Sequence, residues 1–144
     1  MPRLDRDYSV YKYFVAELKQ EQIQTISDFA GTDDMGRHAG LTETSLIMHL
    51  RPDLVDMSTQ DPVEGRSLER LADLRAKGVF TGFNWYGEYP YHIAGNPGPA
   101  SAELGRMIFE MKCKNLAEVI RAVKADDESE KIISEYGPLG EKPV

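Results

Sequence analysis

The sequence has 144 residues, of which 41% are hydrophobic and 28% charged, as expected of one compact globular domain. Its net charge of -7 argues against nucleic acid as a partner, because phosphate binding requires a local concentration of Lys and Arg. The one cysteine, Cys113, excludes an internal disulfide and a multi-cysteine zinc site, and the lack of an apolar signal core or membrane-length run predicts a cytoplasmic protein without a membrane partner.

The first half of the chain is predicted to contain one strand and one clear helix. Residues 10–16 (VYKYFVA) are β-branched and aromatic, which favours a buried strand. Residues 17–26 fit a short helix or a loop, and the Gly- and Asp-rich stretch 30–40 favours a loop. A helix is predicted over 41–50, with Thr42 as its cap.

The second half is predicted to be mainly helical. Residues 67–77 form an amphipathic pattern that predicts a helix, whereas the aromatic and Gly-containing stretch 80–93 indicates short strands or an ordered loop. The Gly- and Pro-rich run 95–99 is a turn signal, and a long helix is predicted over 100–125. Residues 126–144 are acidic and then Gly- and Pro-containing, which indicates a peripheral tail.

A strand followed by helices, with polar clusters in the loops, indicates an α/β layer protein. We assign residues 1–125 to this domain and residues 126–144 to an acidic C-terminal tail. A sheet covered on both faces requires more strands than the sequence offers, so we expect part of the fold to come from elsewhere.

The most informative stretch is 36–55, GRHAGLTETSLIMHLRPDLV. It places His38 in a Gly-flanked loop and Glu43 in the first turn of the predicted helix, where the helix dipole favours a carboxylate. An imidazole and a carboxylate across a loop-to-helix junction have the layout of a proton shuttle beside a metal ligand or an orienting carboxylate. A structural role, with Glu43 as a capping carboxylate, fits the same spacing.

Two motifs resemble those of the creatininase family. The stretch HAGLTETSLIMHLRPDLV resembles the family's H-A-G-x-x-E-T-S signature with its following helix, and GNPGPASAELGRMIFEMKCKNLAEVI resembles its Gly-x-Pro-x-x-Ala-Ser-x-x-x-Gly stretch and C-terminal helix. The resemblance covers about residues 8–125, and the first motif is the more specific of the two.

The resemblance implies a three-layer α/β/α fold and a cyclic oligomer, often a hexamer. Members hydrolyse cyclic amides and related C–N bonds at a two-metal centre of zinc or manganese, where a metal-bound hydroxide attacks the carbonyl carbon. By this resemblance, His38 contacts substrate and carries a proton to the leaving nitrogen. Glu43 is a metal ligand or a group that orients one.

The sequence departs from the family pattern in the motifs that supply most metal ligands. It has neither the opening Glu-x-His…Asp cluster nor the Asn-Gly-His-Gly-Gly-Asn-like turn. A catalytic zinc site needs about three protein ligands, which His38 and Glu43 alone do not provide. We therefore expect only the C-terminal half of the fold in this chain, with a complementary N-terminal subunit or fragment holding most ligands of the divalent ions.

Candidates for substrate binding come from two further parts of the chain, the loop 30–40 and the aromatic stretch 80–93. Asp34 and Met35 replace the Trp and Asp that precede the motif histidine in creatininase, which argues against creatinine as substrate. Asp34 is itself a substrate-binding candidate, although an acidic pair such as Asp33-Asp34 is typical of a solvated turn. The aromatic stretch predicts a pocket wall for a ring or sugar-like substrate, or alternatively a packing surface against another subunit, and its candidate residues are Trp85, Tyr86 and His92.

The resulting hypothesis is a metal-dependent hydrolase subunit that acts on a cyclic amide, another C–N bond or a sugar- or polyol-derived ring. The competing hypothesis is a non-catalytic accessory or structural subunit that retains the fold.

Overall fold

The computed structural model of the chain describes residues 10–13, 18–61 and 63–136, and for residues 133–136 the backbone alone. The chain divides into two compact units: residues 18–112 form the larger, and residues 1–17 together with 113–144 form the smaller.

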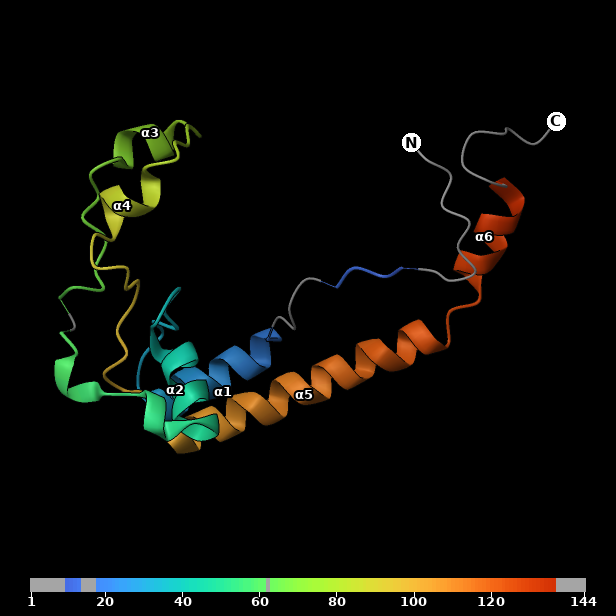
Figure 1. The fold of residues 1–144 in the computed structure, drawn as a ribbon, viewed down its shortest axis with the longest axis horizontal. Helices are drawn as coiled ribbons and strands as arrows, with labels where there is room; N and C mark the ends of the chain where they lie inside the picture. Colours follow the sequence, from blue (N-terminus) through green and yellow to red (C-terminus); the bar gives the residue numbers. More distant parts are fainter. Residues whose placement is uncertain (1–9, 14–17, 62, 137–144) are drawn as a thin grey trace. The chain divides into compact units, whose positions relative to one another are not determined.

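Three helices enclose the core of the larger unit: α1 (Gln20–Ala30), α2 (Leu41–Leu50) and the first half of α5 (Ala102–Lys124). They lie together in Figure 1. The helical spacing of the apolar residues in α5 directs one face of that helix to the core. The fully buried hydrophobic side chains of this cluster are Ile26, Leu41, Leu104 and Ile108.

The helices predicted over 41–50 and 100–125 are confirmed, with observed bounds of Leu41–Leu50 and Ala102–Lys124. The predicted cap Thr42 is wrong, because Gly40 is the N-cap of α2. Residues 17–26 were predicted as a helix or a loop, and residues 20–26 of this stretch form the first part of α1. That helix ends where Gly31 adopts the left-handed conformation, with φ 68°, which glycine adopts at no steric cost.

The helix predicted over 67–77 is much shorter in the structure, where α3 spans only Ala72–Ala76. The backbone amides of two preceding residues donate hydrogen bonds to Glu88 instead. Leu68 N donates to the Glu88 carbonyl at 3.0 Å, and Leu71 N donates to the Glu88 carboxylate at 3.1 Å. Glu69 has a φ of 53°, which is incompatible with a continuous right-handed helix. The amphipathic pattern was therefore overridden by a long-range contact.

Glu88 ends α4 (Asn84–Glu88), a short helix inside the stretch predicted as short strands or an ordered loop. Its carboxylate is buried, accepts a hydrogen bond from the Ser67 hydroxyl, and pairs with Arg75 at 2.9 Å. The Ser67 hydrogen bond, aided by the Leu71 amide and Arg75, lowers the pKa of Glu88 below its ordinary value, although burial acts in the opposite direction. Glu88 thus joins α3 and α4.

Replacing Glu88 by glutamine is expected to lower the urea midpoint of unfolding at neutral pH. A carboxylate whose pKa is depressed in the folded state stabilises that state above pH 4.5, the ordinary glutamate value, and loses this contribution as the pH falls through the folded-state pKa. The difference between wild type and variant should therefore narrow as the pH falls below 4.5, as measured by circular dichroism in urea. Glu69→Gln, at the exposed partner of Arg75, is the control, and an equal pH dependence in both variants would contradict this role.

The structure corrects the expected layered sheet. Among the described residues no strand is formed, and the only β-type pairing is the isolated antiparallel bridge between His38 and Ala94. The strand predicted over 10–16 is wrong for residues 10–13, and its remaining residues lie outside the described part of the chain. A β-branched pattern forms a strand only when a neighbouring strand accepts its hydrogen bonds, and the described residues supply none.

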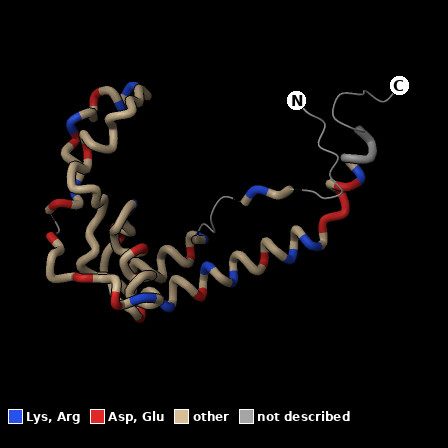
Figure 2. Tube along the Cα trace, in the orientation of Figure 1, with Lys and Arg blue, Asp and Glu red and all other residues tan. Residues whose placement is uncertain are grey.

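The smaller unit contains the second half of α5 and a further helix, α6 (Glu128–Tyr136), within the stretch predicted as a tail. Asp126 accepts hydrogen bonds from Glu128 N at 3.0 Å and from the Tyr11 hydroxyl at 2.6 Å. Hydrogen bonds, chiefly that of Ser129 and then that of Tyr11, lower the pKa of Asp126 to about 2. Figure 2 shows acidic residues gathered where α6 begins and basic residues along the second half of α5.

Within the described ranges, every helix is too short or too polar to cross a membrane.

Candidate functional site

The loop that carries His38 is held by backbone hydrogen bonds to the segment before the Gly- and Pro-rich turn. His38 N donates to the Ala94 carbonyl at 3.2 Å, and Ala94 N donates to the His38 carbonyl at 2.9 Å. Arg37 N donates to the same Ala94 carbonyl at 2.6 Å. The backbone on which the imidazole sits is therefore fixed by a segment distant in sequence.

The two glycines on either side of His38, Gly36 and Gly40, are required by close backbone approach. A Cβ built on Gly36 would lie 2.5 Å from the Cα of Gly40, and a Cβ on Gly40 would lie equally close to the Cα of Gly36. Gly36 also has a φ of 69°, in the left-handed region. These two glycines close the loop around His38 and bring it to the start of α2.

Glu43 lies in the first turn of α2 and has two partners. Its Oε2 accepts a hydrogen bond from Ala39 N at 2.8 Å, so it satisfies a backbone donor at the helix start. The same oxygen lies 3.5 Å from Nδ1 of His38. Both side chains are more than half exposed, at 58% for His38 and 53% for Glu43. The structure thus brings the predicted pair together, and the Ala39 contact also gives Glu43 a structural partner just before the N-cap residue of α2, Gly40.

The aromatic stretch 80–93 contacts His38 through Trp85. The rings of Trp85 and His38 lie edge to face, with centroids 5.7 Å apart. Nε1 of Trp85 donates a hydrogen bond to Nδ1 of His92 at 3.0 Å, and the rings of Tyr86 and His92 are 5.4 Å apart. Glu43, His38, Trp85, His92 and Tyr86 therefore form one continuous chain of contacts.

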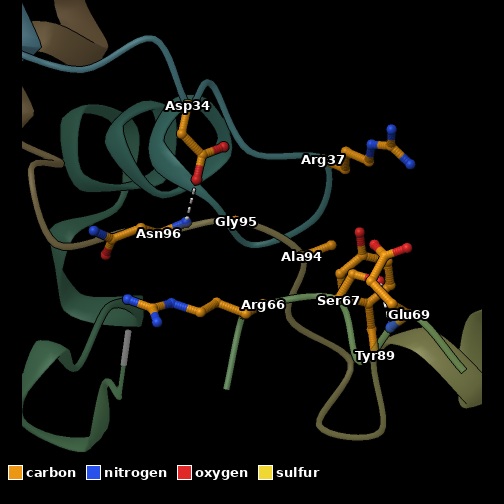
Figure 3. Close-up of a pocket in the computed structure, with 10 residues that line it drawn as sticks. Asp34, Arg37, Arg66, Ser67, Glu69, Tyr89, Ala94, Gly95 and Asn96 are labelled. Carbon is orange, nitrogen blue, oxygen red and sulfur yellow. Dashed lines mark hydrogen bonds between the residues drawn. The ribbon is translucent and has the colours of Figure 1, made fainter. Parts of the chain in front are cut away.

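Asp34, the sixth predicted site residue, is not part of this chain of contacts. Its Oδ1 accepts from Gly36 N at 2.9 Å and its Oδ2 from Asn96 N at 3.2 Å. It lines a separate cavity of about 470 Å³, where Figure 3 shows it directed at the Asn96 backbone while the Arg37 side chain extends away. In the structure Asp34 holds the loop to the segment that also carries Ala94.

Glu43 lines a second cavity, of about 370 Å³, between α2 and the two 3-10 turns η1 (Pro52–Leu54) and η2 (Met57–Thr59). The cavity wall is mostly apolar. Gln60 also lines it, and the buried Nε2 of that residue has no hydrogen-bond partner among the described residues. A buried donor without a partner is costly, which makes Gln60 a candidate ligand contact that the sequence alone did not single out.

The described residues do not by themselves fit a metal centre. Within that part of the chain, no group of three or more His, Cys, Asp or Glu side chains is placed to hold a metal ion. The His38–Glu43 pair supplies two potential ligands, fewer than a zinc site requires.

The last residues of the two motifs pack against each other. Ser101 N donates to the buried Ser45 hydroxyl at 3.3 Å, and the Ser101 hydroxyl accepts from Leu104 N at 3.1 Å at the start of α5. A Cβ on Gly105 would lie 2.5 Å from the Ser45 carbonyl carbon, so glycine allows α5 to contact α2 directly. Both motifs therefore have a structural role that the sequence analysis did not assign to them.

Comparison with known proteins gives one match. The family model of creatininase, described as creatinine amidohydrolase, matches residues 3–120. Because this match starts near the first residue of the chain, it does not single out a C-terminal half of the family fold. No curated protein and no solved structure matches the chain.

Proposed function

The chain belongs to the creatininase family, and on that premise we propose that it contributes a proton-transfer pair, His38 and Glu43, to an amidohydrolase site. Family membership supports the amidohydrolase class. The metal dependence, the substrate and the roles of the two residues are our proposal.

The observation that carries the proposal is the 3.5 Å approach of Glu43 Oε2 to His38 Nδ1. A carboxylate at Nδ1 favours the tautomer that carries its proton there, which leaves Nε2 free to accept a proton. The Ala39 amide holds Glu43 in place from the other side. In this arrangement His38 is the general base and acid that carries a proton to the leaving nitrogen, and Glu43 orients it.

The cavity beside Glu43 is the proposed place for a small substrate. Its volume of about 370 Å³ and mostly apolar wall suit a compact ring, and Gln60 Nε2 offers a donor to a substrate oxygen. We propose a cyclic amide, another C–N bond or a sugar- or polyol-derived ring as substrate. Trp85, Tyr86, His92 and Asp34 do not line this cavity, so substrate contact by these residues stays a prediction from the sequence.

Since the described residues do not fit a metal centre, we assign no step to a metal held by this chain alone. We propose that zinc or manganese ions are held mainly by another polypeptide segment, the complementary N-terminal part of the family fold, with Glu43 as this chain's contribution. A cyclic, hexamer-like oligomer and a cytoplasmic location complete the proposal.

Metal analysis of the purified chain tests whether the metal ions are held mainly by another polypeptide segment. The chain alone is expected to retain far less than one equivalent of zinc or manganese after dialysis and to open no ring in a panel of cyclic amides, because two ligands bind these ions weakly. The chain purified with its bound partner is expected to retain metal and to hydrolyse at least one amide. Full metal stoichiometry in the chain alone would contradict the proposal.

The alternative, an accessory subunit that retains the fold without chemistry, is favoured by one observation. Glu43 already has a structural task at the start of α2, and both members of the pair are more than half exposed. If this alternative holds, an active complex will keep its activity when His38 is replaced.

A further inference from the structure

The single tryptophan of the chain has a defined hydrogen-bond partner. Nε1 of Trp85 donates to Nδ1 of His92 at 3.0 Å. Because Nδ1 is the acceptor, a neutral His92 must carry its proton on Nε2. His92 therefore accepts the hydrogen bond of the indole only while its Nδ1 carries no proton.

The other side of the same indole meets His38. The two rings are 5.7 Å apart at an interplanar angle of 76°, an edge contact typical of favourable aromatic pairs. Trp85 contacts both imidazoles, so it is the residue that links His92 to His38.

The backbone at His92 is also unusual. His92 has a φ of 61°, in the left-handed region that residues other than glycine seldom adopt. His92 N donates to the Tyr89 carbonyl at 3.0 Å, which closes this turn. A strained residue persists only where its surroundings hold it, and such residues gather at functional sites.

From these contacts we infer that His92 is a positioning residue that holds the Trp85 indole against the imidazole of His38. This inference rests on the proposed function only in giving His38 a catalytic role; the contacts themselves do not depend on it. It assigns His92 a task different from the substrate contact predicted from the sequence.

Two variants separate the acceptor from the ring. His92→Asn keeps an acceptor near the position of Nδ1 and tolerates the left-handed backbone, but loses the ring. His92→Phe keeps a ring against Tyr86 but has no acceptor. Far-UV circular dichroism of each variant establishes that the helices are retained.

Solvent exchange of the indole N–H is the direct measurement, because one tryptophan gives one such signal in a proton–nitrogen spectrum. Exchange in His92→Phe is expected to be at least about tenfold faster than in wild type, and His92→Asn is expected to remain close to wild type. The ring-proton signals of His38 should move in the phenylalanine variant and stay in the asparagine variant. Unchanged exchange in His92→Phe, or an equal acceleration in both variants, would overturn the inference.

The exchange measurement does not involve turnover, so a failure of the proposed hydrolase function leaves its result interpretable.

Discussion

In the assembled enzyme, replacing His38 by glutamine is expected to lower kcat by about 10²- to 10⁴-fold, the usual contribution of general acid–base catalysis. Glutamine has similar reach and polarity but does not accept and release a proton as imidazole does. The Glu43 contact to Ala39 N remains available, so the loop and the start of α2 should keep their structure. Steady-state hydrolysis of the amide identified for the complex gives kcat and KM separately.

His49→Gln is the matched control, because it makes the same chemical change at a different histidine, which lies in α2. His49 lies against α5, with its ring centroid 5.8 Å from that of Phe109. Its kcat should stay within a few-fold of wild type. An active complex whose kcat is equally insensitive to both substitutions would exclude His38 as proton shuttle and establish the accessory role.

Replacing Gly105 by alanine is expected to destabilise the chain strongly. This is the opposite of what helix propensity alone predicts, because alanine favours a helix more than glycine does. In an exposed helix interior, alanine is favoured over glycine by about 1 kcal/mol. At Gly105 the added Cβ would lie 2.5 Å from the Ser45 carbonyl carbon and 2.9 Å from the Cβ of His49. Relief requires α5 and α2 to separate, and overpacking of this kind costs about 1–3 kcal/mol or more. Urea unfolding followed by circular dichroism measures the net loss.

Gly82→Ala is the control for this substitution. A Cβ at Gly82 would meet no heavy atom within 4 Å, and the residue does not have a positive φ. Its free energy of unfolding should change by less than about 0.5 kcal/mol. A Gly105→Ala variant as stable as wild type would show that α5 does not contact α2 as closely as the structure has it.

The helices α2 and α5 could be predicted because their signals are local. Apolar residues at helical spacing, with Gly- and Pro-rich turns before α5, define these two elements without reference to the rest of the chain. The start of α2 also placed Glu43 in its first turn and His38 in the loop before it. The spacing of the two side chains then put them within reach of each other.

The helix predicted over 67–77 shows where local signals fail. Its first residues have a helical pattern, but their amides bond to Glu88, a residue from the following stretch. No local feature of the sequence marks Glu88 as the acceptor, because the carboxylate becomes buried only when α3 and α4 meet.

Motifs and helical periodicity are properties of short segments, so the family, the main core helices and the His38–Glu43 pair could be inferred from the sequence. The folded chain was needed to show that Trp85 contacts both His38 and His92, that Asp34 is directed to backbone amides, and that Gly105 lies against Ser45. These contacts join segments far apart along the chain, and their geometry is set by the packing of α2 on α5 and by the bridge between His38 and Ala94.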